Sequence, residues 1–312
     1  MRYETRTRRI GSVAVAASIG LLVLSLGISP APSDAGQQGT LPWKPAPGTE
    51  ARYMGTEMCL MCHADKTETF ALNPHQGATV RLGHASGDIT CEACHGPGDE
   101  HANAGGDLAL VVQNFSDAAT VDAACQACHA GTTGHTMGTS SQHVAAGVAC
   151  TSCHTIHQTP VTTGLMTAAS PGLCFSCHLD VMATFQAADR HRLNQGVVSC
   201  ESCHNPHGSP EPAMLAKTMA GGELCVTCHF AQRGPFVYQH PVGTVEGCVA
   251  CHTPHGSANR FMLKTQQVRE LCISCHIDAP TFHDVSNSRY RVCTDCHTAI
   301  HGSDTHRLFF RR

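Results

Sequence analysis

Cysteine and histidine recur along this 312-residue chain in one fixed spacing, C-x-x-C-H. Ten copies of this motif use all 20 cysteines of the chain. On one helical turn, positions i, i+3 and i+4 lie on the same face, so the two thiols and the imidazole of a motif can all approach one flat group. Two thiols that can bond vinyl groups, beside a histidine that can bind iron, form the attachment site of a c-type haem. The sequence therefore predicts ten covalently bound haem c groups.

We number the motifs 1 to 10 in chain order. Their first cysteines are Cys59, Cys91, Cys125, Cys150, Cys174, Cys200, Cys225, Cys248, Cys272 and Cys293. Their second cysteines are Cys62, Cys94, Cys128, Cys153, Cys177, Cys203, Cys228, Cys251, Cys275 and Cys296. The histidines that end the motifs, predicted as proximal iron ligands, are His63, His95, His129, His154, His178, His204, His229, His252, His276 and His297. Disulfides or zinc sites would also use many cysteines, but neither explains a histidine after every second cysteine.

The motifs alternate in their surroundings, so the repeating unit, which we call a module, is two motifs. Each even-numbered motif has a leading histidine before it and a trailing histidine after it. The leading histidines are His75 or His84, His143, His191, His240 and His283. The trailing histidines are His101, His157, His207, His255 and His301. Successive odd motifs lie 66, 49, 51 and 47 residues apart, a period typical of a stacked array whose units contact mainly their neighbours.

The histidines outside the motifs are numerous enough to give every iron a second, distal ligand. Of 23 histidines, ten belong to motifs, and two more per module supply the ten that are needed. We favour His75 over His84 because an aromatic residue precedes it by a few positions, as before two other leading histidines. We expect the remaining His135 and His306 to be solvated or hydrogen-bonded surface residues. A trailing histidine such as His207 follows its own motif too closely to reach the far face of that haem, so it should serve a neighbouring one.

Iron with two imidazole ligands has no open position for a substrate, so such haems normally carry electrons. Every motif ends in histidine, and nothing in the chain resembles a reaction centre. The ten methionines could also ligate iron, but with enough histidine present we interpret them as soft packing against porphyrin. We therefore predict an electron-transfer protein without catalytic residues.

Ordinary core material is scarce, because aromatic residues make up 5% of the chain and 29 glycines and 16 prolines interrupt it. We expect the macrocycles to supply the core. The predicted fold is a multihaem cytochrome c, mostly irregular with short α-helices and little or no β-structure, in an elongated array of five dihaem modules. Residues 181–192 and 265–272 are predicted as the longer helices. The formal charge of −4 argues against a nucleic-acid partner.

Residues 1–35 have the plan of a secretory signal peptide: four arginines, then an apolar run over residues 10–28, then small residues. Export to the periplasm is therefore predicted. An uncleaved N-terminal anchor is the main alternative, because the apolar run approaches the length that spans a bilayer. Residues 36–57 are predicted as a Pro-rich linker, residues 58–302 as the decahaem electron-transfer domain, and residues 303–312 as a frayed C-terminal tail.

Together these features resemble the MtrA/DmsE family of periplasmic decahaem c-type cytochromes. The resemblance rests on the motif number, the chain length, the segments Cys59 to His63 and Cys91 to Gly98, and the repeated C-x-x-C-H-x-x-H form. It covers residues 52–302. The chain departs from the pattern at His301, which follows its motif histidine by four positions rather than three.

The resemblance implies a haem wire inserted into an outer-membrane β-barrel porin. Such a wire carries electrons between periplasmic or inner-membrane cytochrome donors and an extracellular multihaem cytochrome or another extracellular acceptor. Two alternatives are a diffusible periplasmic carrier that feeds a terminal reductase, and a multihaem oxyanion reductase. The reductase would need at least one haem with an open iron position.

Overall fold

The computed structural model describes residues 53–70, 73–75, 90–111, 115–132, 135, 137, 140–157, 163–278, 283–284 and 286–310. The chain divides into a unit of residues Met1–Gln37 and a unit of residues Gln38–Arg312. The predicted signal peptide, nearly all of the linker, and His84 lie outside the described residues. No helix among the described residues is long and apolar enough to cross a membrane.

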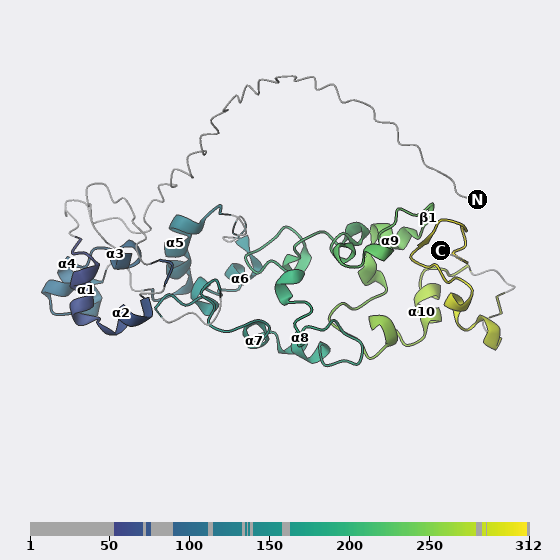
Figure 1. Ribbon diagram of the computed structural model, residues 1–312, viewed down its shortest axis with the longest axis horizontal. Coiled ribbons are helices and arrows are strands. Elements are labelled where there is room, and N and C mark those ends of the chain that lie inside the picture. Colours follow the sequence, from purple (N-terminus) through teal and green to yellow (C-terminus); the bar gives the residue numbers. More distant parts are fainter. Residues whose placement is uncertain are drawn as a thin grey trace, which may run out of the picture. The chain divides into compact units, whose positions relative to one another are not determined.

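Short helices joined by irregular chain make up the second unit (Figure 1). The α-helices are α1 (Thr56–Cys62), α2 (Asp65–Phe70), α3 (Thr90–His95), α4 (Asp99–Asn103), α5 (Ala118–His129), α6 (Gln142–Ala145), α7 (Gly172–Phe175), α8 (Leu179–Thr184), α9 (Pro241–Val245) and α10 (Val268–Ile273). The 3-10 helices are η1 (Leu108–Leu110), η3 (Cys150–Ser152), η4 (Cys200–Ser202), η5 (Pro212–Met214), η6 (Ala220–Gly222), η7 (Cys225–Thr227), η8 (Phe230–Gln232), η9 (Cys248–Ala250), η10 (Arg260–Met262), η11 (Ser288–Tyr290) and η12 (Cys293–Asp295).

Strand structure in the described residues is confined to β1 (Tyr238–Gln239) and β2 (Gly302–Ser303). The two strands pair antiparallel, with Tyr238 opposite Ser303 and Gln239 opposite Gly302. The prediction of short helices, irregular chain and little β-structure is confirmed.

The predicted helical turn at each motif is also confirmed. In eight motifs the backbone N–H of the final histidine donates to the carbonyl of the first cysteine at 2.8 to 3.0 Å. The other two motifs, numbers 2 and 3, lie within α3 and α5. This i to i+4 bond closes one turn and brings both thiols and the imidazole to one face, as the spacing requires.

Both longer helices that the sequence predicts are shorter in the structure. Helix α8 ends at Thr184, whose hydroxyl donates to the carbonyl of Val181 at 2.7 Å and competes with the helical bonds. Beyond it, Asp189 forms a bridge with Ser257 instead of continuing the helix. Helix α10 begins at Val268, because the preceding residue Gln267 has an extended backbone.

Few apolar side chains of the polypeptide are buried. The buried apolar residues among those described are Val121, Leu165, Phe185, Leu193, Leu224 and Ala299. A unit of this length normally buries a much larger core. The cysteines and histidines of motifs 1 to 8 line instead one connected cavity of about 4060 Å³, and this cavity takes the place of a conventional core.

Candidate haem-binding array

Within each module, the first cysteines of the odd and even motifs lie against each other. Their thiols are hydrogen-bonded in the pairs Cys59 with Cys91, Cys125 with Cys150, Cys174 with Cys200, Cys225 with Cys248, and Cys272 with Cys293. In the fourth pair, this hydrogen bond lowers the pKa of the Cys248 thiol to about 6 and raises the pKa of Cys225. The contact recurs in all five modules, so the two motifs of a module form one structural unit.

Between modules, the second cysteine of an even motif faces the next odd motif. Burial raises the pKa of Cys94 to about 11, and the nearby thiols of Cys125 and Cys128 add to the shift. The same neighbour relation joins Cys153 to Cys177, Cys203 to Cys228, and Cys251 to Cys275. Each attachment site therefore adjoins the next one along the sequence, from motif 1 to motif 10.

Each motif histidine faces a second imidazole at a nearly constant distance between ring centroids. The pairs are His63 with His101 (6.3 Å), His95 with His157 (5.8 Å), His129 with His75 (6.0 Å), His154 with His207 (5.9 Å), His178 with His143 (6.2 Å), His204 with His255 (6.0 Å), His229 with His191 (6.0 Å), His252 with His301 (6.3 Å), His276 with His240 (6.2 Å) and His297 with His283 (6.4 Å). The structure thus brings together all twenty histidines that the sequence selects. They are the residues that could hold iron.

Most of these pairs cross from one module to the next. A leading histidine faces the odd motif of the following module, as His143 faces His178. A trailing histidine faces the even motif of the preceding module, as His207 faces His154. Each of the four junctions between modules therefore carries two imidazole pairs, one contributed in each direction.

The two ends of the array depart from this exchange. His101 trails motif 2 and faces His63 of motif 1, within the first module. His283 leads motif 10 and faces His297 of that same motif. The outermost motif histidine of each end module thus finds its partner within its own module, because no further module lies beyond it in the array. His301, despite its unusual spacing, lies at the same distance from its partner as the other trailing histidines.

In modules 2 to 5, backbone carbonyls orient the histidine of the even motif. A loop after each even motif folds back, so that the histidine Nδ1–H donates to a carbonyl nine to eleven residues ahead. The bonds run from His154 to Gly164 (2.7 Å), His204 to Ala213 (2.8 Å), His252 to Phe261 (2.8 Å) and His297 to Leu308 (2.5 Å). With Nδ1 occupied in this way, Nε2 is the nitrogen left to bind a metal.

Nδ1 of several distal histidines is held in the same manner. His143 donates to the carbonyl of Pro206 at 3.0 Å, and His191 donates to that of Pro254 at 2.6 Å. Each acceptor belongs to the next module, immediately before that module's trailing histidine. The Asn-Pro-His and Thr-Pro-His segments therefore present one imidazole and orient another.

These carbonyl acceptors were not predicted from the sequence. Their signal is an apolar pair just after the acceptor, Leu165-Met166, Met214-Leu215 or Met262-Leu263. Leu165, Met214 and Met262 have φ of 58°, 53° and 54°. This left-handed turn lets the N–H that follows the motif histidine bond to the loop, as Thr253 does to Met262 at 2.8 Å.

Two expectations about residues outside the ligand set are wrong. His135 is not a solvated surface residue, because it is partly buried and stacks on His207 at 3.8 Å between ring centroids. The tail is not frayed through residue 310. Phe309 packs on His240 at 5.6 Å, Phe310 packs on His297 at 5.0 Å, and Ser303 is fully buried.

A further buried polar residue, not predicted from the sequence, lies in the first module. Glu92, within motif 2, is 2% exposed. Its carboxylate accepts backbone N–H bonds from Met54 (3.0 Å), Gly55 (2.9 Å) and Gly98 (2.9 Å). It fastens the chain before α1 to motif 2, and so holds the two motifs of the first module together.

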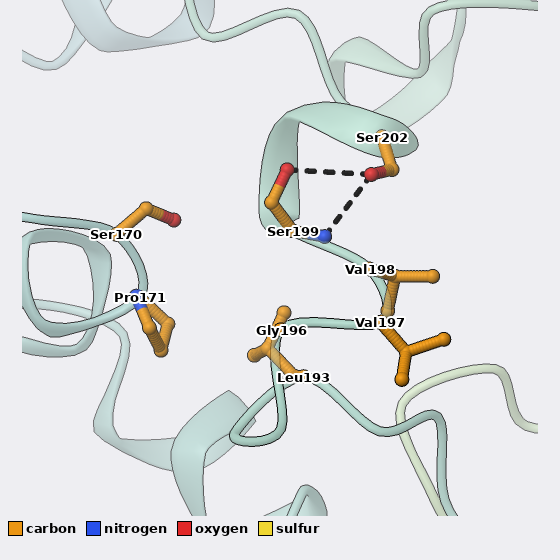
Figure 2. Close-up of a pocket in the computed structure, with 8 residues that line it drawn as sticks. All are labelled: Ser170, Pro171, Leu193, Gly196, Val197, Val198, Ser199 and Ser202. Carbon is orange, nitrogen blue, oxygen red and sulfur yellow. Dashed lines mark hydrogen bonds between the residues drawn. The ribbon is translucent and has the colours of Figure 1, made fainter. Parts of the chain in front are cut away.

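A smaller cavity of about 260 Å³ lies beside motif 6 and shares part of its lining with the large one (Figure 2). Ser199 and Ser202 bond to each other at its edge, with Ser199 N–H donating to Ser202 Oγ at 3.0 Å. Its lining holds no cysteine or histidine, so it lacks the groups that attach haem. Among the described residues, no three or more Cys, His, Asp or Glu side chains cluster as the ligands of a single bare metal ion.

Comparison with known proteins agrees with this site. Residues 142–183, 191–234 and 240–281 match the family model described as a doubled CXXCH motif. Residues 101–155 match the model of cytochrome c554 and c-prime. The chain is also 34% identical to a protein from Shewanella baltica (strain OS185) named multihaem cytochrome MtrA, across 80% of this chain and 79% of that relative.

Proposed function

The chain belongs to the family of MtrA-like multihaem c-type cytochromes, and we propose that it binds ten haem c groups, each with two histidine ligands, and conducts electrons along them. Covalent haem c and electron transfer follow from the family and from the repeated motifs. The number of haems and their ligation rest on the ten imidazole pairs.

The spacing of those pairs supports ligation by two histidines. A bond from a metal to an imidazole nitrogen is about 2 Å long and the ring centroid lies about 1 Å further, so imidazoles on opposite sides of one metal are about 6 Å apart. The ten observed distances fall between 5.8 and 6.4 Å. The carbonyls that accept from Nδ1 also fit, because they leave Nε2 as the nitrogen available to a metal.

Bound haem c supplies iron that accepts and releases single electrons. The chain's own residues determine where those electrons can go. The paired imidazoles would hold the iron from both sides and leave substrates no position on it, and the contacts between cysteines bring each attachment site beside the next. This arrangement supports conduction and gives an oxyanion reductase no open position.

We further propose that the conductor works across the outer membrane, inside a β-barrel porin, between periplasmic or inner-membrane donors and an extracellular multihaem cytochrome. The family resemblance supports this location, together with the export signal predicted at residues 1–35. Extraction of native outer membranes with a mild detergent, followed by haem-stained native gels and mass spectrometry, tests it. We expect the cytochrome to be recovered in the membrane fraction in a stoichiometric complex with a barrel protein.

Recovery as a free protein in the periplasmic fraction, with no barrel protein attached, would contradict the conduit and favour a diffusible carrier. A haem of open coordination in the purified protein would instead favour the reductase. The two observations are independent, so each alternative has its own test.

A further inference from the structure

His135 lies where a ligand would lie, although the ten distal positions have other occupants. Its ring centroid is 6.0 Å from that of His129, the histidine of motif 3. His75 lies at the same 6.0 Å from His129. Motif 3 therefore brings two imidazoles from outside the motifs to one motif histidine.

Chain length allows His135 to reach the far side of the haem of its own motif. A trailing histidine three residues after its motif can extend only about 10 Å, whereas the six residues from His129 to His135 can extend about 20 Å. A turn in which His135 N–H donates to the carbonyl of Thr132 at 2.9 Å brings the imidazole back toward motif 3.

His75 is the better fixed of the two. Asn73, 3% exposed, accepts from both the backbone N–H of His75 at 2.9 Å and its Nδ1–H at 3.0 Å. Asn73 in turn donates to the carbonyl of Ile156 at 2.7 Å. His75 also follows the rule that a leading histidine serves the next module. It is therefore the resting ligand.

We propose that His135 is a reserve sixth ligand for the haem of motif 3 and replaces His75 when that bond opens. The inference rests on the proposed function. In the exchange one iron–nitrogen bond breaks and another forms, and both ligands are neutral imidazoles, so no proton or electron is transferred. His135 also stacks on His207, the distal histidine that faces motif 4. Movement of His135 in the exchange at motif 3 would therefore change a contact of the next site in the row.

The angle between the ligand planes gives the exchange a spectroscopic signature. The rings of His75 and His129 are at 78°, the most nearly perpendicular of the ten pairs, whereas those of His135 and His129 are at 39°. Nearly perpendicular imidazoles give a highly anisotropic low-spin electron paramagnetic resonance signal, and smaller angles give ordinary rhombic signals. Replacement of His75 by His135 as the ligand should therefore convert the highly anisotropic signal of this haem into an ordinary rhombic signal.

The test uses the full holoprotein of four variants: His75→Ala, His135→Ala, the double variant, and His143→Ala as a matched control. His143 is also a leading histidine. It faces His178, and no second imidazole is described opposite His178. Intact mass counts the haems, and spin-quantified electron paramagnetic resonance counts high-spin iron. If intact mass shows that His75→Ala has lost one of the ten haems, the same spectra are recorded on His75→Gln, which keeps a polar side chain beside Asn73.

We expect His75→Ala to keep ten low-spin haems but lose the anisotropic signal. His135→Ala should keep that signal, and the double variant should gain one high-spin haem, as should His143→Ala. One high-spin haem in the single variant His75→Ala would overturn the proposal that His135 is a reserve ligand. The absence of high-spin haem in the double variant would overturn it as well. No high-spin haem in His143→Ala overturns the ligand assignment of the proposed function itself.

Discussion

His143 and His178 face each other at 6.2 Å although they belong to different modules, because His143 leads motif 4 and His178 ends motif 5. The same junction carries the reverse pair of His154 and His207. If each pair holds one iron, no interior module can complete its own coordination. Neighbouring modules are then joined by metal–ligand bonds as well as by packing, which compensates for the small apolar core.

Replacement of one distal histidine should open one iron. His191 lies 6.0 Å from His229, and we expect His191→Ala to convert the haem of motif 7 alone to a high-spin, ligand-binding form. Magnetic circular dichroism with added carbon monoxide measures this. His306→Ala is the control, since His306 contacts Phe310 rather than a motif histidine. An unchanged spectrum for His191→Ala would refute its assignment as a ligand.

Loss of the Glu92 carboxylate should destabilise the first module. Glu92→Ala leaves three backbone N–H groups without their acceptor, at a cost of about 3 kcal/mol or more. Glu201 occupies the same position in motif 6 but is exposed, with one 3.4 Å contact from Ser170 Oγ. Denaturant unfolding followed by circular dichroism should show a lower midpoint for Glu92→Ala and no change for Glu201→Ala. Equal midpoints for the two variants would rule out the clamp.

Gly256 permits a close approach of α8 that should set the position of His255, a proposed distal ligand. It follows His255 at a φ of 150°, and a Cβ there would collide with the carbonyl oxygen of Thr184 in α8. We expect Gly256→Ala to push His255 away from His204 and give the haem of motif 6 partial high-spin character. Gly196→Ala is the control, because Gly196 also has a positive φ, of 69°, but open space around it.

For the glycine pair, the control variant should lose only the roughly 1–2 kcal/mol that a left-handed alanine costs, with no spectral change. Spin-state spectra and thermal unfolding of the two variants distinguish the outcomes. Identical spectra for both would mean that the approach of α8 does not set the position of His255.

The C-terminal tail should stabilise the last module. Phe309 packs on His240, and its carbonyl accepts the Ala299 N–H at 2.9 Å. Phe309→Ala keeps that backbone bond but removes the ring, which should cost about 1–2 kcal/mol and lower the melting temperature. Phe230, 75% exposed, is the control, and Phe230→Ala should melt as the parent does. A melting temperature of Phe309→Ala equal to that of the parent would show that the tail contributes no stability.

Much of the array could be predicted from local spacing. The turn at each C-x-x-C-H follows from helical geometry over five residues, and the scarcity of aromatic side chains predicts the small apolar core. The partner of each distal histidine could not be predicted, because the choice of motif depends on the path of the chain across a whole module. His207, for example, faces a motif histidine 53 positions earlier rather than one in its own module.

Other features escaped because their chemistry is in the backbone or comes from distant segments. A carbonyl acceptor such as that of Ala213 is the same in every residue type, so only the left-handed turn beside it leaves a sequence signal. His135 resembled any isolated histidine until the fold placed it beside His129 and His207. Charged termini predict a frayed tail, whereas the pairing of β1 with β2 shows that this one is anchored.

The central claim is that two histidines close both axial positions of ten haems. The most direct test is spin-quantified, low-temperature electron paramagnetic resonance of the oxidised wild-type holoprotein. The account predicts low-spin iron equivalent to ten haems per chain and no high-spin signal. A high-spin signal equivalent to one haem, or low-spin iron well short of ten, would contradict it.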